Sequence, residues 1–233
     1  MFFLLSIMLA QGCDAESLGV RVPRGGREVL QAAVLKRDLW KMTDPRIGGR
    51  VPGSSGARRV AQYIAARFEA ASLKPVFDSS YRRDLGPNIG EMVCGVHLGS
   101  GDQSVVVAAL DPGIGTVSAI PVAGVLSVAA TFDAPTAPMH SLYFCVLPEA
   151  GGLTGFTTRG PVPYQTVLES FTIGTLTGSA LVSDLGPTLG PVQSQLLHSG
   201  PLDGAMTDDL GQLDYETILA RLGDIYSRIA AVD

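Results

Sequence analysis

Histidines, cysteines and a few acidic residues are the side chains here that could take part in acid–base or metal chemistry. The three histidines, His97, His140 and His198, stand far apart along the 233-residue chain. We expect His97 on a strand and His140 at the entry of one, which is the wrong end for a site in an α/β protein. His198 falls in a loop that could approach a cleft, although exposure to solvent is the simpler interpretation.

The three cysteines are Cys13, Cys94 and Cys145, and they form no CxxC pair and no Cys/His cluster. A structural zinc site, which is built from such clusters, is therefore not expected. Cys94 and Cys145 fall midway along expected strands, where cysteine is most often a small buried hydrophobic residue. The sequence leaves open whether these two cysteines pair.

Motifs for nucleophilic or phosphate chemistry are missing as well. There is no Gly-x-Ser-x-Gly elbow, and Gly99-Ser100-Gly101 has the composition of a hairpin turn. The glycine-rich segment 151–155 lacks the lysine of a phosphate-binding loop and the spacing of a dinucleotide-binding loop. The motifs therefore give no support to a serine hydrolase or a nucleotide-binding protein.

The composition describes one apolar domain of ordinary size. Hydrophobic residues make up 46% of the chain and charged residues 17%, with a mean hydropathy of +0.27. The net charge is −5 and no basic run occurs, which makes nucleic acid an unexpected partner. A chain with this many apolar and this few charged residues suits a protein that buries part of its surface against protein partners.

The N-terminus has the pattern of an export signal. Residues 2–10 form an apolar run, too short to cross a bilayer, and Gln11-Gly12-Cys13 follows. Cys13 resembles the lipidated cysteine of bacterial lipoproteins, although no Lys or Arg precedes the run and Ala10 stands where leucine is usual. An ordinary secretory signal and an apolar strand docked on a partner are the alternatives. We expect export to the periplasm or cell surface, with lipid anchoring at Cys13.

We divide the chain into residues 1–13 as the signal, 14–26 as a linker, and 27–233 as one domain. Three long amphipathic helices are expected. The first runs from Glu28 to before Asp44, the second from a cap at Ser55 to about Ala71, and the third over the last 20 residues from Asp214. The expected buried faces are Val29, Leu30, Ala33, Val34, Leu39 and Trp40 in the first, Val60, Ile64, Ala65 and Phe68 in the second, and Ile218, Leu219, Leu222, Ile225, Ile229 and Val232 in the third.

Buried strands alternate with these helices. Residues 89–98 and 104–110 are expected to form a hairpin across the turn 99–102, and residues 142–147 and 171–176 two further strands. Val105 to Leu110 is continuously apolar, as in a strand covered on both faces. Short helices are expected over 124–132 and from Gly152 to Phe156. Helices interleaved with buried strands predict an α/β fold, a three-layer α/β/α sandwich around a central mixed β-sheet.

Several segments, in order, resemble the co-catalytic di-zinc aminopeptidases, a family that includes the glutaminyl cyclases and the peptidase-like domains of transferrin receptor and nicastrin. Residues 47–53 and 56–58 are similar to the family's "GR-PG-xGA" segment, and Tyr63-Ile64-Ala65 and Leu73-Lys74-Pro75 to its continuation. Asn88-Ile89-Gly90 is similar to "NVIG", and Asp214-Tyr215-Glu216 to "LDYE". The order and spacing of these segments carry the resemblance, which covers residues 28–233.

This resemblance implies five zinc ligands and a glutamate general base. Zinc held by His, Asp and Glu would lower the pKa of a bound water toward neutrality. The resemblance places Glu149 at the position of the general base. At the ligand positions it places no side chain that is a normal zinc donor. These positions are Leu110, Ile120, Ala150, Thr175 and Gly204.

We therefore expect no metal and no cofactor, and a non-catalytic, peptidase-like pseudoenzyme that acts as an exported, membrane-associated subunit of a protein complex. One alternative is a hydrolase, metal-free or with ligands rearranged among Asp111, Glu149, Asp208 and His198. Another is a peptide- or small-ligand-binding module with an apolar pocket lined by Leu110, Ile120 and Glu149. Otherwise Glu149 is a solvated strand-end carboxylate, Asp111 and Asp133 are turn and helix-end residues, and Trp40 and Phe68 bury on the sheet.

Overall fold

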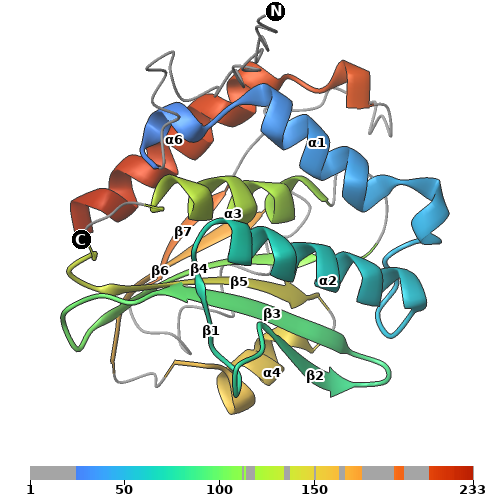
Figure 1. Cartoon of the computed structure of the whole chain (residues 1–233), viewed down its shortest axis with the longest axis horizontal. Coiled ribbons are helices and arrows are strands. Elements are labelled where there is room, and N and C mark those ends of the chain that lie inside the picture. Colours follow the sequence, from blue (N-terminus) through green and yellow to red (C-terminus); the bar gives the residue numbers. More distant parts are fainter. Residues whose placement is uncertain are drawn as a thin grey trace, which may run out of the picture.

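A mixed β-sheet with helices on both faces forms the protein, as its computed structural model shows (Figure 1). The structure describes residues 25–111, 113, 119–133, 137–149, 151–162, 166–174, 192–196 and 210–232. The helices of this part are α1 (Ala32–Thr43), α2 (Ser55–Ala70), α3 (Ile120–Thr131), α4 (Gly152–Arg159) and α6 (Tyr215–Val232). The strands are β1 (Lys74–Pro75), β2 (Arg82–Gly86), β3 (Gly90–His97), β4 (Ser104–Asp111), β5 (Ser141–Pro148), β6 (Val167–Gly174) and β7 (Val192–Leu196). The predicted three-layer α/β fold is confirmed.

The centre of the sheet is parallel. The strand order is β1-β3-β5-β4-β6-β7, with β2 pairing beside β1 on β3. Strands β5, β4, β6 and β7 run parallel, whereas β3 runs antiparallel to β5. The prediction of a hairpin between residues 89–98 and 104–110 is therefore wrong, because β5 lies between the two strands. Helix α3 provides the crossover from β4 to β5 that a parallel pair needs.

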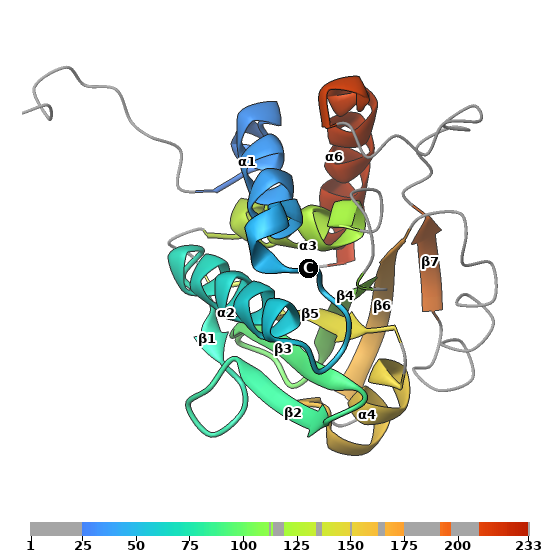
Figure 2. The same ribbon diagram turned by 90° about the vertical axis from the view of Figure 1, so that its right-hand side faces the viewer.

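Two tiers of helices cover one face of the sheet (Figures 1 and 2). Helix α2 packs on β3 and α3 packs on β4, β5 and β6, while α1 and α6 lie on α3, farther from the sheet. Eleven of the twelve residues of α3 are buried, since this helix has neighbours above and below. The predicted buried residues Ile218, Leu222, Ile225 and Ile229 of α6 all lie in this hydrophobic core.

The first helix differs from its prediction. The segment before α1 forms a short 3-10 helix, Arg27–Val29, and α1 begins at Ala32. The face of α1 that packs on the core carries Leu35, Asp38, Leu39 and Met42, whereas Trp40 is 49% exposed. The expectation that Trp40 is buried is therefore wrong. Phe68, in contrast, is fully buried under α2, as predicted.

Asp38 explains how a charged side chain fits that packed face. Its carboxylate accepts a hydrogen bond of 2.6 Å from the Tyr63 hydroxyl and lies 3.2 Å from the Arg67 guanidinium. Both partners come from α2, so this buried acid joins α1 to α2. Burial, with the hydrogen bond to Asp38, raises the pKa of Tyr63 to about 12.

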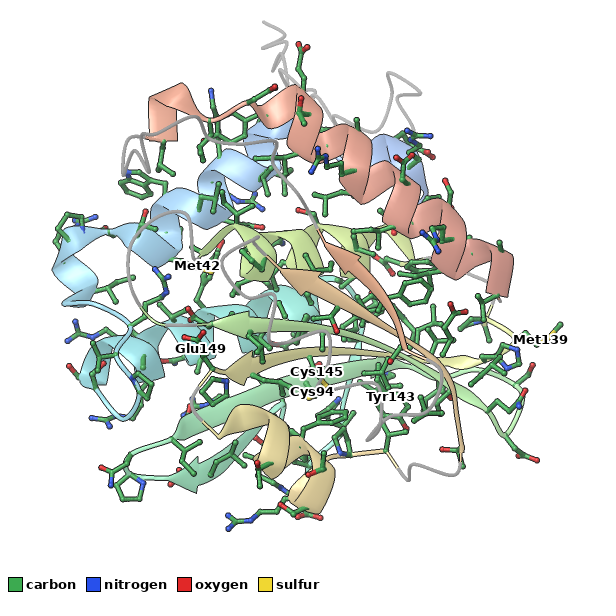
Figure 3. The ribbon with its side chains drawn as sticks, turned by 180° about the vertical axis from the view of Figure 1, so that it is seen from behind. Met42, Cys94, Met139, Tyr143, Cys145 and Glu149 are labelled. Carbon is green, nitrogen blue, oxygen red and sulfur yellow. A yellow bond between two sulfur atoms is a disulfide. The ribbon has the colours of Figure 1, made fainter. Side chains whose placement is uncertain are left out.

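The opposite face of the sheet carries a smaller hydrophobic cluster beneath α4. Cys94 of β3 and Cys145 of β5 stand directly opposite each other in the antiparallel register and form a disulfide on this face (Figure 3). Both sulfur atoms lie among buried apolar side chains, including Met92 and Phe156. The pairing that the sequence left open is thus settled in the structure.

Residues 1–24 lie outside the described part of the chain, so the signal, Cys13 and most of the predicted linker do too. The last two linker residues, Gly25 and Gly26, lie against the end of α3, where the Gly26 amide donates to the Thr131 carbonyl. Among the described residues, none of the helices has the length and apolar character to cross a membrane.

Candidate functional site

The carboxyl ends of β4 and β5 are where an α/β sheet of this kind would hold its ligands. Asp111 is the last residue of β4 and lies beside Pro148, the last residue of β5. The loop that follows α1 reaches the same edge and brings Arg50. The site therefore combines the end of one strand with a loop from 61 residues earlier in the chain.

Arg50 and Asp111 form a largely buried ion pair. The Arg50 Nε atom lies 3.3 Å from both carboxylate oxygens, and its Nη1 donates to the Met42 carbonyl at 3.3 Å. Arg50 is 5% exposed and the Asp111 side chain 14%. Asp111 has the expected turn contact, since its carboxylate accepts a hydrogen bond from the Gly113 amide, and it forms the ion pair with Arg50 in addition.

Glycines make this close approach of the backbone possible. Gly113 has a φ of +81°, and a Cβ there would lie 2.6 Å from the Arg50 carbonyl oxygen. A Cβ at Gly56, in the first turn of α2, would collide with the Gly49 carbonyl. Gly56 and Gly113 are thus needed to pack the loop 48–53 against α2 and against the end of β4, which places Arg50.

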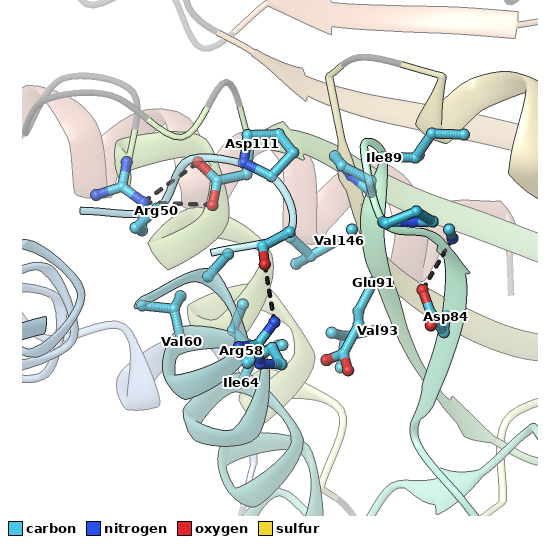
Figure 4. Close-up of a pocket in the computed structure, with 18 residues that line it drawn as sticks. Arg50, Arg58, Val60, Ile64, Asp84, Ile89, Glu91, Val93, Asp111 and Val146 are labelled. Atoms are coloured by element: carbon cyan, nitrogen blue, oxygen red, sulfur yellow. Dashed lines mark hydrogen bonds and ion pairs between the residues drawn. The ribbon is translucent and has the colours of Figure 1, made fainter. Parts of the chain in front are cut away.

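A pocket of about 280 Å³ lies beside the ion pair, between α2 and the sheet (Figure 4). Its apolar lining comes from α2 and from the ends of β3 and β5, including Val60, Ile64, Val93 and Val146. None of Leu110, Ile120 and Glu149, the residues of the predicted apolar pocket, lines this one.

The charged residues at this pocket have partners within the protein. Glu91 accepts two hydrogen bonds from Arg82, at 2.8 and 2.9 Å. Asp84 accepts the Gly86 amide, and Arg58 donates to the Gly53 carbonyl. These contacts hold the β2–β3 turn and the loop before α2 in shape, and none of them is arranged as an acid–base pair.

The resemblance assigned ligand roles to Leu110 and Ile120, and both are buried in hydrophobic cores. Leu110 belongs to the cluster beneath α4, whereas Ile120, the first residue of α3, belongs to the core on the other face. Glu149 follows β5 and is exposed, with its amide bonded to the Asp111 carbonyl (Figure 3). Ala150, Thr175 and Gly204 lie outside the described residues, as do Asp208 and His198.

The family resemblance implies a zinc site, and the residues at this edge show whether zinc could bind there. Leu110 and Ile120 offer no donor atom, and the one carboxylate at the end of β4 faces a guanidinium. In the described part of the chain, no three His, Cys, Asp or Glu side chains gather closely enough to hold a metal ion. The described residues therefore do not fit a di-zinc centre.

The histidines lie away from this edge. His97 ends β3 and packs edge-on against Phe144, with ring centroids 6.2 Å apart. Burial lowers the pKa of His97, against the opposing effects of the Ala129 carbonyl and Asp133. His140 stands just before β5, at the entry end, as predicted.

Comparison with solved structures identifies the architecture. A glutaminyl cyclase from Porphyromonas gingivalis superposes with a TM-score of 0.62 at 10% sequence identity, over 88% of this chain and 99% of that one. A leucine aminopeptidase precursor from Bacteroides thetaiotaomicron gives 0.60 at 11% identity, over 90% and 98%. A zinc-dependent exopeptidase from Parabacteroides distasonis gives 0.58 at 13%, over 90% and 99%.

The chain has the fold of zinc-dependent exopeptidases and glutaminyl cyclases. No protein-family model matches the sequence, and no curated protein matches it either. At these identities the likeness establishes the fold alone. The segments that suggested the resemblance thus pointed to the right architecture.

The Arg50–Asp111 pair is the feature of the site that the sequence did not yield. In the sequence, Arg50 belongs to the glycine-rich segment and Asp111 follows the apolar run 105–110, and nothing in the sequence connects the two residues. A charged residue directly after a fully buried strand could have prompted a search for a partner of opposite charge.

Proposed function

We propose that this protein is a non-catalytic, peptidase-like domain that acts as an interaction or structural subunit. The observation that carries the proposal is the buried Arg50–Asp111 pair at the carboxyl end of β4, flanked by the apolar Leu110. A peptidase of this fold needs donor atoms at that edge to activate water. Here the edge has a satisfied ion pair and buried hydrocarbon.

The electrostatics of the pair support this proposal. A carboxylate that faces a guanidinium at 3.3 Å is already neutralised. A divalent cation would have to displace Arg50 and leave its positive charge in a region with little water, which is strongly unfavourable. Glu149, at the general-base position of the resemblance, would then have no metal-bound water to deprotonate.

Export and membrane association belong to the same proposal. The Cys94–Cys145 disulfide supports export, because disulfides persist in oxidising compartments such as the periplasm. The segment ending at Cys13 has the pattern of a signal and a lipidation site. A lipid-anchored domain that contributes surface to a complex would need neither metal nor cofactor.

Activity assays on the purified full chain test the non-catalytic role. We expect no release of product from aminoacyl-nitroanilide reporters and no cyclisation of N-terminal glutaminyl peptides, with or without added zinc. Turnover that a chelator abolishes and zinc restores would refute the proposal. The glutaminyl cyclase of P. gingivalis, assayed in parallel, serves as the positive control for the second reaction.

A hydrolase that uses Asp111 and Glu149 without the family's ligands is the alternative that their position favours. Both residues end adjacent parallel strands, and the Glu149 amide donates to the Asp111 carbonyl at 3.1 Å. Such an enzyme would lose its turnover in the Glu149→Gln variant. The non-catalytic proposal predicts identical, background-level rates for the wild type and this variant.

Binding of a small ligand is a second candidate function, favoured by the pocket between α2 and the sheet. The pocket offers an apolar floor from Ile64, Val93 and Val146 and a mouth with charges of both signs. A variant with Ala57→Trp, which narrows the pocket from its wall, tests this candidate. Saturable binding of a hydrophobic fluorescent probe that this substitution weakens would support it, and equal binding would oppose it.

A further inference from the structure

The outward face of α1 is both basic and aromatic. Lys36, Arg37, Trp40 and Lys41 are exposed on it, at the spacing of one helix face. Trp40 is the only tryptophan of the chain and is 49% exposed. A half-exposed tryptophan among cations is unusual for a solvated helix, because tryptophan is highly buried on average.

Asp38 is the only acid of α1, and it is buried toward Tyr63 and Arg67 of α2. Its carboxylate also lies 3.4 Å from the Arg37 guanidinium, so Lys36 and Lys41 are the cations of this face that carry its positive charge. The positive charge of this face also opposes the net charge of the whole chain, −5. Asp214 and Glu216, at the start of α6, are exposed acids. The Asp214 carboxylate caps α6, since it accepts hydrogen bonds from the amide and the hydroxyl of Thr217.

A shallow groove of about 470 Å³ gives this face its apolar component. Its lining combines Ala33 and Trp40 of α1 with Leu210 and Tyr215. The Lys36 Nζ lies 4.6 Å from the centre of the Tyr215 ring, and the Lys41 Nζ 5.1 Å from that of Trp40. Each ammonium group thus lies over the face of a ring, and Trp40 is the ring that is exposed, whereas Tyr215 is buried. An exposed tryptophan beside lysines suits a membrane interface, where the indole enters the headgroup layer and the cations meet phosphates.

We propose that this face of α1 is the contact site for an anionic phospholipid surface. Helix α1 belongs to the outer tier of helices, far from the sheet, so a flat surface can approach it (Figure 2). The proposal rests on the membrane association proposed above. An acidic protein would be recognised by the charges alone, whereas the exposed tryptophan and the apolar groove favour lipid.

The tether makes a weak contact sufficient. If Cys13 is anchored, the 11 residues 14–24 that precede the packed Gly25 can span on the order of 35 Å when extended, which keeps α1 within reach of the membrane. Contact then becomes an intramolecular step with a high effective concentration. Lys36, Lys41 and Trp40 would then orient the domain on the surface, although their binding alone is weak.

Trp40 makes the test direct, because every change in tryptophan emission reports this face. The full chain with Cys13→Ser, which cannot carry an acyl anchor, is mixed with vesicles of phosphatidylcholine with or without phosphatidylglycerol. We expect the Trp40 emission to shift to shorter wavelength with the anionic vesicles only. High salt, which shortens the screening length, should reverse the shift.

Matched charge variants identify the residues responsible. The double variant Lys36→Gln with Lys41→Gln should lower the partition coefficient for anionic vesicles about 30-fold, since each lysine near the surface raises this coefficient about fivefold. Lys74→Gln, which removes an exposed lysine on β1, should leave it unchanged. Circular dichroism of each variant would verify that the fold is retained.

Three results would overturn the inference: no shift of emission, an equal shift with uncharged vesicles, or sedimentation with vesicles at unchanged emission. The last would mean that another segment, such as residues 2–10, binds the lipid. Because this chain lacks Cys13, failure here leaves lipid anchoring intact. The anchor itself is tested by the intact mass of the native protein.

Discussion

At the scale of single residues, the site is defined by what Asp111 contacts. A carboxylate at the end of a parallel strand is a common metal or acid–base group, and the sequence alone allowed that reading. The structure turns this carboxylate toward Arg50, 61 positions earlier in the chain. Local patterns do not contain such a long-range contact, which is why the pair could not be predicted.

Removal of Asp111 tests the structural role of the pair. Asp111→Ala leaves the buried Arg50 guanidinium without its carboxylate, and we expect a loss of about 3 kcal/mol of unfolding free energy. Urea denaturation measures it. Arg46→Ala, which breaks the solvent-exposed pair with Asp44, should change the midpoint little. An Asp111→Ala midpoint equal to that of the wild type would show that the pair does not stabilise the fold.

His97 gives a pH dependence with a definite sign. Its pKa is lowered in the folded protein by burial, so the unfolded chain binds the proton more readily. Stability should therefore fall as the pH drops below the unfolded value of about 6.5 and stop falling below the folded pKa. His97→Phe keeps a ring against Phe144 and removes the titration. Chemical denaturation between pH 7 and pH 5 should show a smaller decrease in this variant, and equal decreases would contradict the assignment.

At the scale of elements, the sequence predicted most helices and strands but not their neighbours. The buried apolar run of β4 and the amphipathic face of α6 are local properties, and both were predicted correctly. The hairpin prediction failed because β5, which begins 30 residues after the end of β4, inserts between β3 and β4. For α1 the end was predicted correctly and the start was not, and Asp38 rather than Trp40 faces inward, since α2 provides a partner for its charge.

The N-cap residue of α2 differs from the predicted one. Ser55 was expected to cap this helix, whereas the Ser54 hydroxyl accepts the bond from the Ala57 amide at 3.0 Å. Ser54→Ala should therefore cost about 1 kcal/mol of stability. The neighbouring Ser55→Ala is the matched control and should cost almost nothing. Thermal or urea unfolding of the two variants decides between them, and a larger loss for Ser55→Ala would reverse the assignment.

At the scale of the whole molecule, the chain combines the fold of zinc exopeptidases with an apolar, ion-paired edge at the carboxyl ends of β4 and β5. The disulfide joins β3 to β5 across the antiparallel pair, and the helices form two tiers on the other face. Segments 47–58 and 88–90 indicated this architecture, and in the first of them a Cβ at Gly53 or Gly56 would collide with backbone atoms. Ala150, Thr175 and Gly204 stay predictions, as they lie outside the described residues.

The disulfide should contribute to global stability. It closes a loop between positions 51 residues apart, so the loss of chain entropy in the unfolded state corresponds to about 4 kcal/mol. Cys94→Ala with Cys145→Ala should lower the urea midpoint accordingly. Cys13→Ala should leave the midpoint unchanged. The pairing itself is checked by alkylating the native protein without a reductant and measuring its mass. Alkylation of Cys94 and Cys145 under these conditions would contradict the pairing.

The affinity of the full chain for zinc tests the central claim most directly. Purified protein is equilibrated with excess zinc, passed through a desalting column, and its bound zinc is measured by elemental analysis. Because the edge of β4 and β5 offers buried hydrocarbon and a neutralised carboxylate, we predict far less than one zinc ion per chain. Retention of two zinc ions per chain, lost in the Asp111→Ala variant, would contradict this account.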